Sequence, residues 1–359
     1  MNTATGFKVA RASAGRVAHW IHAKFLWLLL ASYVVAGFFP AWGLAMKQLS
    51  FGQLHVFQET VRLSLPMLML SFLLLNAGLG VDLSTFKSSY VGVGALAAGL
   101  IANLAVPVTF ILLVTQLMRL WHNPDEVQNI LVGLALIASM PIAGSSTAWS
   151  QNANGNMALS LGLVLLSTIA SPITTPLALH SVGLMTTGDY AEDLHELAAG
   201  GSGGFLAVCV VIPSLAGVAL RRALGKERVA KAKPNLKLAN AVVLLALNYA
   251  NASVSLPEAV GNPDPDFLAV ILTLTVALCA ATFSAGWLIA RWFQVDLASR
   301  TALMFGLGMN NNGTGLVLAS MALANHPRVM LPIIFYNLVQ HLVAGVVDRC
   351  LGKADGVTR

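Results

Sequence analysis

The apolar residues of this chain fall into long blocks that are separated by short polar stretches. Each block has about the 20 residues that an α-helix needs to cross a hydrocarbon core of roughly 30 Å. The blocks are residues 25–45, 63–81, 91–117, 129–149, 157–180, 203–220, 238–254, 267–290, 301–324 and 329–347. The pattern predicts an all-α polytopic membrane protein with ten transmembrane helices.

A polar segment at residues 184–202 divides the ten blocks into two sets of five. This segment is acidic and leads into the run GGSGG at 200–204. An odd number of crossings in each half means that the halves insert in opposite orientations, which is the plan of many secondary transporters. The sequence therefore predicts two inverted five-helix repeats, 25–183 and 203–347, joined by an external linker at 184–202.

Composition and charge placement support the membrane class and indicate an orientation. Hydrophobic residues make up 57% of the chain and charged residues only 10%, whereas soluble domains carry about 25% charged residues. If the N-terminus is cytoplasmic, 17 of the 21 Lys and Arg residues lie on the cytoplasmic side, as the positive-inside rule requires. We therefore predict an inner (plasma) membrane protein with cytoplasmic tails at 1–24 and 348–359. The net charge of +6 then reflects topology and contact with the lipid bilayer rather than nucleic-acid binding.

The fourth and ninth blocks carry polar residues and glycines where a membrane helix should be most apolar. The fourth contains GSSTA at 144–148, and the ninth contains GMNNNG at 308–313. Gly and Asn disfavour the helix, and a freed backbone group in lipid costs several kcal/mol unless it is satisfied. Because the two segments hold the same position in each half, we predict broken helices 4 and 9 whose breaks, near 144–148 and 308–313, pack against each other.

The two predicted breaks offer ligands for both an anion and a cation. Half-helix N-termini present unpaired N–H groups to an anion, while unwound carbonyls and side-chain oxygens can surround a cation. Neutral amide and hydroxyl oxygens suit a hard cation such as Na⁺. The candidate oxygen donors are Ser146, Thr147, Ser160, Asn310, Asn311 and Asn312.

In these segments the chain resembles the bile acid:sodium symporter family. The motifs that look like the family's fourth and fifth helices are GSSTA (144–148), GNMALS (155–160), ST (167–168), SP (171–172) and TP (175–176). GMNNNG (308–313) resembles a motif of helix nine, NAGLG (76–80) the end of helix two, and HLVAG (341–345) a motif of helix ten. The similarity extends over about residues 60–346.

The resemblance implies ten helices in two inverted repeats, with helices four and nine crossing where they unwind. It also implies a core of helices 3–5 and 8–10, a panel of helices 1, 2, 6 and 7, and an organic-anion substrate between them. The function that it implies is secondary active symport by alternating access, with Na⁺ as the coupling ion. We expect no other cofactor and no obligate protein partner.

The family's sodium ligands carry over only where residues match. Ser146 and Ser160 match two family serines, Thr147 stands where the family has Asn, and Asn310 where it has Gln. Gly306 occupies the position of a glutamate that both family sodium sites share. The predicted sodium-site residues are Ser146, Thr147, Ser160, Gly306, Met309, Asn310 and Asn103; the predicted substrate-site residues are Asn76, Asn311, Asn312, Thr314, Asn337 and His341. Without that carboxylate, we expect at most one tightly coupled Na⁺, with sodium and substrate strengthening each other's binding.

Several functional alternatives stay open at this point. His341 lies inside the tenth block, where it is either a proton relay or a hydrogen-bonding group between helices. Proton-coupled or uncoupled transport, export instead of uptake, and a channel built on the same broken helices are compatible with the sequence. An enzyme would need an acid–base pair, a metal cluster or an activated nucleophile, and no such set is evident, so we predict no enzyme. The sequence does not identify the anion.

Overall fold

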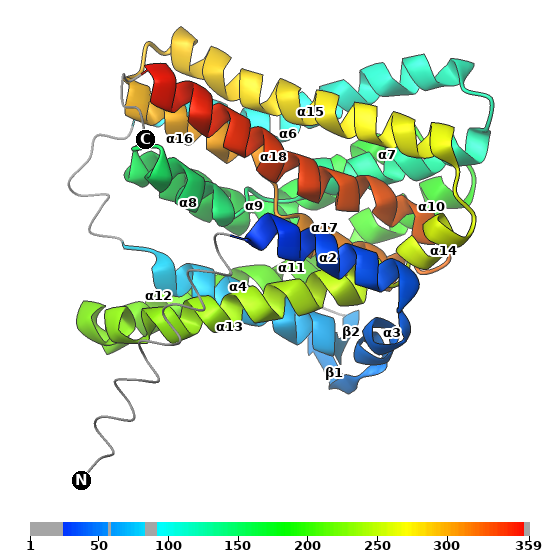
Figure 1. The fold of residues 1–359 in the computed structure, drawn as a ribbon, viewed down its shortest axis with the longest axis horizontal. Coiled ribbons are helices and arrows are strands. Elements are labelled where there is room, and N and C mark those ends of the chain that lie inside the picture. The colour runs from blue at the N-terminus through cyan, green and yellow to red at the C-terminus, as the bar shows by residue number, and fades with distance from the viewer. Residues whose placement is uncertain (1–23, 57–58, 83–91, 355–359) are drawn as a thin grey trace. The chain divides into compact units, whose positions relative to one another are not determined.

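The computed structural model describes residues 24–56, 59–82 and 92–354, and most of these are helical (Figure 1). Residues 1–23 and 355–359 of the predicted cytoplasmic tails lie outside the described residues. The chain divides into two compact units, each of which is discontinuous in sequence. The first unit takes the residues up to Val81 together with Val208–Asn262, and the second takes Asp82–Ala207 together with the residues from Pro263 onward. The first unit holds predicted helices 1, 2 and 7 and most of helix 6, and the second holds predicted helices 3–5 and 8–10 with residues 203–207. Their roles as panel and core stay a prediction.

The first unit contains six helices and a β-hairpin among its described residues. Its elements are α2 (Phe25–Phe38), α3 (Ala41–Gln48), β1 (Ser50–Val56), β2 (Glu59–Ser64), α4 (Leu65–Gly80), α12 (Ile212–Leu224), α13 (Lys226–Ala252) and α14 (Leu256–Gly261). The first predicted block bends by 90° between α2 and α3, because Pro40 provides no N–H and disfavours the helical conformation in the residue before it.

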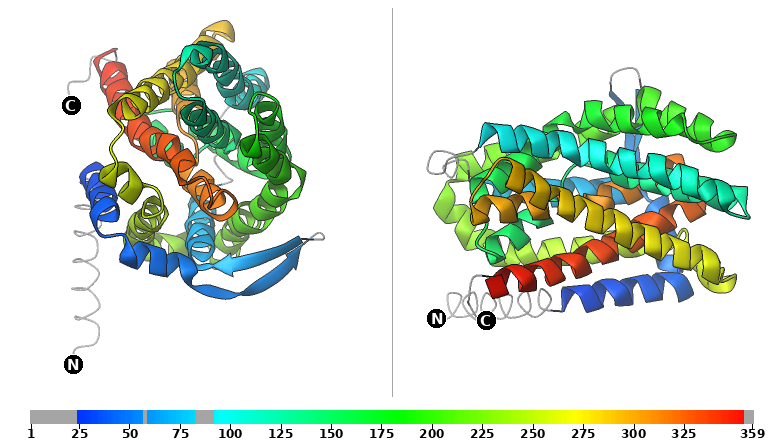
Figure 2. Two further views of the ribbon diagram at one scale, coloured as in Figure 1. Left: turned by 90° about the vertical axis from the view of Figure 1, so that its right-hand side faces the viewer. Right: turned by 90° about the horizontal axis from the view of Figure 1, so that it is seen from above.

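The hairpin corrects the all-α prediction. Strands β1 and β2 pair antiparallel, with Gln53 opposite Arg62 and Val56 opposite Glu59 (Figure 2). The sequence over both strands alternates polar and apolar residues, and this period of two is typical of a strand rather than a helix. The hairpin joins α3 to α4 and leaves the helical blocks on either side unchanged.

Helices α4 and α12 of the first unit pack backbone against backbone. A Cβ added to Gly78 would meet the carbonyl oxygen of Ser214, and one added to Gly217 would meet that of Leu75. Glycine is therefore required at both positions for the two helices to approach this closely. At the end of α4, Arg221 Nη1 donates a hydrogen bond to the Leu79 carbonyl oxygen at 3.0 Å, which satisfies one of the carbonyls that a helix C-terminus leaves free.

The second unit carries the remaining helices of the described chain. They are α6 (Val93–Leu117), η1 (Met118–Leu120), α7 (Pro124–Ser139), α8 (Ser145–Asn152), α9 (Met157–Gly183), α10 (Asp189–Glu196), η2 (Leu197–Gly201), α11 (Ser202–Leu206), α15 (Pro265–Trp292), α16 (Leu297–Gly308), α17 (Asn312–Ala322), η4 (Pro327–Val329) and α18 (Met330–Ala354). The turn η3 (Ala207–Val211) spans the boundary between the two units. The segment expected as a linker, 184–202, is thus helical over much of its length.

Local capping explains where four of these helices begin. Each starts after an Asn or Asp whose side-chain oxygen accepts a hydrogen bond from an N–H of the first turn, the strongest N-terminal signal in a sequence. The capping residues are Asn123 for α7, Asn156 for α9, Asp264 for α15 and Asp296 for α16. In these four helices, the polar residues that separate the apolar blocks therefore also determine where the helix begins.

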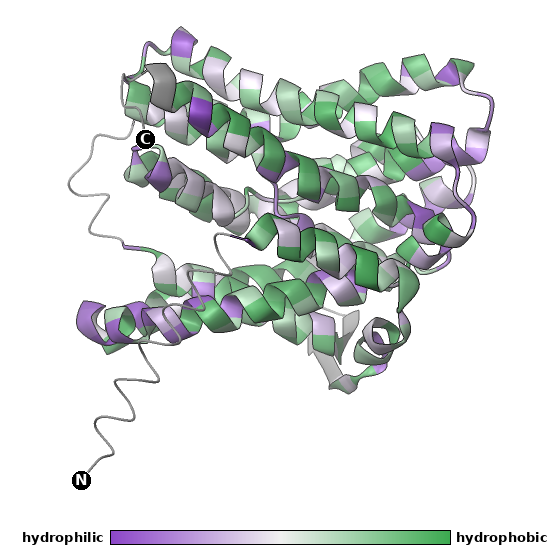
Figure 3. Ribbon diagram, viewed as in Figure 1, coloured by the Kyte–Doolittle hydropathy of each residue, from purple (hydrophilic) through white to green (hydrophobic). Residues whose placement is uncertain are grey.

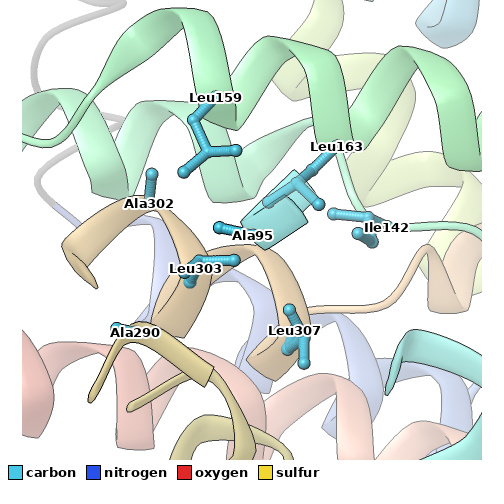
Figure 4. Close-up of a cluster of buried hydrophobic side chains, with 8 residues drawn as sticks. All are labelled: Ala95, Ile142, Leu159, Leu163, Ala290, Ala302, Leu303 and Leu307. Carbon is cyan, nitrogen blue, oxygen red and sulfur yellow. The ribbon is translucent and has the colours of Figure 1, made fainter. Parts of the chain in front are cut away.

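A cluster of buried apolar side chains holds the centre of the second unit. Figure 4 shows these residues converging from α6, α9, α15, α16 and the segment after α7: Ala95, Ile142, Leu159, Leu163, Ala290, Ala302, Leu303 and Leu307. Leu163 and Leu303 have no exposed surface. This cluster packs α16 against α9, and these two helices carry the predicted sodium-site residues Gly306 and Ser160.

The protein is a multi-pass membrane protein. Five helical stretches of the described chain are long and apolar enough to span a bilayer, and α2 with α3 forms a bent sixth candidate. The five are Val93–Leu120, Met157–Gly183, Asp189–Leu224, Pro265–Trp292 and Pro327–Leu351. Apolar residues cover long stretches of these helices (Figure 3), and several of them, such as Ile101 and Ile173, are exposed. The full set of ten transmembrane helices and their inverted arrangement stay predictions.

Candidate functional site

The two broken helices of the second unit are joined to each other through their unwound backbone. The first break is residues 140–144, between α7 and α8, and the second is residues 309–311, between α16 and α17. Ala143 N–H donates to the Met309 carbonyl at 2.8 Å, and Asn311 N–H donates to the Pro141 carbonyl at 2.9 Å. Ile142 and Asn310 lie opposite each other as an antiparallel bridge. Each break thus supplies hydrogen-bond partners to the other, which is how irregular backbone is tolerated inside a membrane protein.

The first break lies earlier in the chain than the sequence predicted. We expected it near 144–148, but residues 145–148 form the first turn of α8. The reason is Pro141, because a proline lacks an N–H and disfavours helical geometry in the residue before it, here Met140. Helix α7 therefore ends at Ser139. The second break falls within the predicted segment 308–313.

The breaks bring helix ends of both polarities together. Helices α8 and α17 begin directly after the breaks, and their first N–H groups carry partial positive charge. Helices α7 and α16 end directly before them, and the carbonyl end of each helix carries partial negative charge. Asn311 caps α17, since its side-chain oxygen accepts from Thr314 N–H at 3.4 Å. The paired breaks therefore place helix ends of positive and of negative partial charge within one small region.

Asn310 is the residue that ties the second break to its surroundings. Its Nδ2 donates to the Ile137 carbonyl at 2.9 Å, and its backbone N–H donates to Gln340 Oε1 at 3.1 Å. Gln340 Nε2 in turn donates to Asn337 Oδ1 at 3.3 Å. These bonds use the donors of Asn310 but leave its Oδ1 without a hydrogen-bond partner. Gln340 was not predicted from the sequence, although its position in an apolar block three residues after Asn337 was a usable signal.

Buried polar atoms without hydrogen-bond partners occur on several of the predicted site residues. Four of the predicted sodium-site residues contribute one such oxygen each: Asn103 Oδ1, Ser146 Oγ, Ser160 Oγ and Asn310 Oδ1. Two predicted substrate-site residues contribute three more atoms, namely Asn312 Oδ1 and Nδ2 and Thr314 Oγ1. Buried polar groups are nearly always paired, and leaving one unpaired costs about 1–3 kcal/mol. Seven of the buried polar atoms without partners thus belong to residues that the sequence predicts to bind sodium or substrate.

The orphaned oxygens belong to elements that pack on one another. Ser146 lies in the first turn of α8, and Ser160 lies in the first turn of α9. Helices α8 and α9 contact each other, and both contact α16, which leads into the second break at Asn310. Asn103 is on α6, which packs against α9 and α16. All four atoms are oxygens of uncharged side chains, and oxygens of this kind are suitable ligands for a monovalent hard cation such as Na⁺.

Gly306 lies in a different environment from these donors. A Cβ added there would lie 2.8 Å from Leu163 Cδ1, and Leu163 belongs to the buried apolar cluster of Figure 4. At the position where the resembling family has a glutamate, a side chain in this protein would therefore point at Leu163. The only group that Gly306 has to offer a cation is its carbonyl, near the C-terminal end of α16.

The other predicted residues occupy varied positions. Thr147 Oγ1 donates to the Gly144 carbonyl at 2.7 Å, and Met309 is buried with its carbonyl used in the pairing of the breaks. His341 lies on α18, the helix of Asn337 and Gln340. Asn76 belongs to α4 in the first unit, where its Nδ2 lies 3.4 Å from Asn240 Oδ1.

Charged ligands are missing from the segments that form this region. The sequence has no Asp or Glu from Val127 to Gly188, nor from Leu297 to Val347. Among the described residues, no group of three or more His, Cys, Asp and Glu side chains is placed to hold a metal ion. A cation bound at the breaks would therefore keep its positive charge uncompensated by protein carboxylates.

Comparison with known proteins identifies the family. Residues 67–260, more than half of the chain, match the sequence model of the Sodium Bile acid symporter family. The chain belongs to this family. Membership in it makes the protein a transporter and not an enzyme. The matched residues of the sodium bile acid symporter family include the first break and α9, and they end before α16.

Three relatives show how far the similarity extends. The uncharacterized protein YbaS of Bacillus subtilis (strain 168) is 27% identical over 226 residues, covering 63% of this chain and 70% of the relative. The uncharacterized sodium-dependent transporter YocS of the same organism is 27% identical over 55% of this chain and 57% of its own length. The probable chloroplastic sodium/metabolite cotransporter BASS1 of Oryza sativa subsp. japonica is 25% identical over 95% of this chain and 72% of its own.

Proposed function

We propose that this protein is a secondary active transporter that carries a small organic anion by Na⁺-coupled symport. The observation that supports this most directly is the set of buried oxygens without partners on Asn103, Ser146, Ser160 and Asn310. Membership in the sodium bile acid symporter family and the names of two relatives, a sodium-dependent transporter and a sodium/metabolite cotransporter, favour the same ion.

The chemistry of the donors favours Na⁺ over other cations. Sites for Ca²⁺ and Mg²⁺ rely on carboxylates, and the segments around the breaks contain no Asp or Glu. Proton coupling would use a titratable group such as His341 on α18, whereas the buried atoms without partners belong to hydroxyl and amide side chains. A monovalent cation with a preference for neutral oxygens is the ligand that these residues fit.

The substrate in this proposal is an anion that binds beside the same breaks. The N-terminal ends of α8 and α17 place partial positive charge beside the breaks, and Asn312 Nδ2 and Thr314 Oγ1 are buried donors without partners. A bound Na⁺ attracts the anion as well. Two unit charges about 4 Å apart interact by about 4 kcal/mol at an effective dielectric of 20, before desolvation is subtracted. Sodium and substrate should therefore strengthen each other's binding.

The proposal includes the finer architecture predicted from the sequence. Ten transmembrane helices form two inverted repeats, and both termini are cytoplasmic at the plasma membrane. The excess of Lys and Arg on one side supports this orientation, and the presence of one break in the fourth predicted helix of each half supports the repeat. Transport then proceeds by alternating access around the fixed breaks, as in other transporters built from inverted repeats.

A ligand screen with and without Na⁺ tests the proposed function. Purified protein is exposed to a panel of carboxylate and sulfonate metabolites in NaCl or choline chloride, and its melting temperature is recorded. We expect at least one anion to raise the melting temperature more strongly in NaCl. Stabilisation by anions that is equal in both salts would contradict sodium coupling and would favour a proton-coupled or uncoupled transporter.

Substitutions at the breaks then test where the anion binds. Asn312→Leu and Thr147→Val should each weaken binding of the identified anion by about 10- to 150-fold, since a polar contact to a charged ligand contributes roughly 1.5–3 kcal/mol. Thr174→Val is the matched control, because Thr174 makes a similar local bond to the Ala170 carbonyl on α9. Unchanged affinity in both break variants, measured by calorimetry, would place the anion elsewhere.

A further inference from the structure

A second candidate site lies away from the breaks, in an open groove between α15, α16 and α18. The groove has a volume of about 290 Å³ and is lined mainly by apolar side chains, among them Phe283 and Trp287 of α15, Met304 of α16 and Val343 of α18. The three helices contact one another, and α15 and α18 lie side by side in Figures 1 and 2. The volume is at the lower end for ligand pockets and suits a single flexible chain better than a bulky molecule.

Two arginines lie four residues from groove residues, one on α15 and one on α16. Arg291 Cζ lies 5.6 Å from the centre of the Trp287 ring, so the guanidinium covers one wall residue. Arg300 precedes Met304 by four residues on α16 and shares its helix face. The Nε of Arg300 is buried and has no hydrogen-bond partner.

Acidic residues close in sequence to these segments do not neutralise the two arginines in the structure. Asp296 uses its Oδ1 to cap α16 through Ser299 N–H at 3.0 Å. Asp348 follows the groove residue Val347 directly in sequence. Neither carboxylate forms an ion pair with Arg291 or Arg300 among the described contacts.

We propose that this groove binds an anionic phospholipid. One acyl chain lies along the apolar wall, and the phosphate of the headgroup binds the guanidinium groups of Arg291 and Arg300. The occupant comes from the bilayer because α15 is a membrane-spanning helix whose neighbouring side chains, Leu288 and Trp292, are strongly exposed. Tryptophan and arginine at a helix end are typical of the headgroup level of a membrane, and basic pockets between such helices recognise anionic headgroups.

Native mass spectrometry of the full-length protein tests this proposal. The protein is mixed with phosphatidylglycerol or phosphatidylcholine of identical acyl chains, and retained lipid is counted. We expect the wild type to retain phosphatidylglycerol at least about tenfold more tightly than phosphatidylcholine. Equal retention of both lipids would overturn the proposal, because it would show only unspecific lipid at the protein surface.

Variants separate the headgroup contact from the groove. The double variant Arg291→Gln with Arg300→Gln should lose the preference for phosphatidylglycerol, and Ser284→Trp, which fills the groove, should lose retention although both arginines remain. The matched control removes two exposed arginines of the first unit, Arg222→Gln with Arg228→Gln, and should behave as the wild type. All variants are compared at equal monodispersity and melting temperature. Loss of the preference in the control, or full retention in Ser284→Trp, would contradict the proposal.

Inorganic phosphate distinguishes a lipid site from a site for a free anion. Phosphate should not displace bound phosphatidylglycerol, since it cannot occupy the apolar part of the groove. If phosphate displaces phosphatidylglycerol at concentrations that do not affect the retention of phosphatidylcholine, the arginines bind a soluble anion. That result would overturn the lipid assignment.

Discussion

Replacing Ser146 or Ser160 by alanine should weaken Na⁺ binding by about 10- to 150-fold, while the sodium-free protein stays as stable as the wild type or becomes slightly more stable. Both hydroxyl oxygens are buried and unpaired, so removing them deletes no hydrogen bond within the protein and relieves an unsatisfied polar group. A ligand bond to a cation is lost instead, and bonds to charged groups contribute roughly 1.5–3 kcal/mol each. The measurement is the melting temperature against NaCl concentration, with choline chloride as the reference salt.

Ser167 provides the matched control for these two variants. It is also a buried serine of α9, but its hydroxyl donates to the Val164 carbonyl at 3.1 Å and accepts from Ile142 N–H at 3.1 Å. Ser167→Ala should therefore lower the melting temperature in both salts and leave the sodium-dependent increment unchanged. If Ser146→Ala and Ser160→Ala destabilise the protein equally in NaCl and in choline chloride, their hydroxyls are structural and not sodium ligands.

Introducing the family's acidic residue, Gly306→Glu, should destabilise this protein strongly instead of improving sodium binding. The new side chain would run into Leu163 and place a carboxylate among the apolar residues of the central cluster. An uncompensated buried charge costs on the order of 3–5 kcal/mol, so we expect a fall in melting temperature of roughly 5 °C or more. Thermal unfolding monitored by intrinsic fluorescence measures this loss.

A second substitution should partly reverse the effect. Leu163→Ala makes room beside position 306 and, on its own, costs about 2–5 kcal/mol because it leaves a cavity. The double variant should be more stable than the sum of the two single losses by about 0.5–3 kcal/mol. Wild-type stability of Gly306→Glu alone, or strict additivity of the two changes, would contradict the placement of Leu163 against position 306.

Much of the fold is readable from hydropathy because membrane helices must be long and apolar. The blocks at 91–117, 157–180 and 267–290 contain no charged residue. Each matches one helix, α6, α9 or α15, and the ends of block and helix differ by no more than a few residues. The blocks could not reveal the hairpin between α3 and α4, because its short strands occupy a polar connection. They also could not show the bend at Pro40, since α2 and α3 read as one continuous apolar run.

The candidate site was partly predictable for a different reason. Consecutive Asn residues at 310–312 conflict so strongly with a lipid environment that a break could be expected there. The first break was predicted too late in the chain. The hydroxyl residues at 145–147 suggested a break there, whereas Pro141 determines where α7 ends. Long-range contacts were beyond the sequence: the bond from Asn310 N–H to Gln340 joins residues 30 positions apart, and the contact of Gly306 with Leu163 depends on the packing of α16 on α9.

Calorimetric titration of NaCl into the purified protein, with choline chloride as the control, tests the central claim that the paired breaks form one sodium site with neutral ligands. The claim predicts saturable, sodium-specific binding of a single Na⁺ per chain, which disappears in the Ser146→Ala/Ser160→Ala double variant and persists in Ser167→Ala. Two Na⁺ bound tightly in the absence of substrate, or no binding that distinguishes sodium from choline, would contradict it.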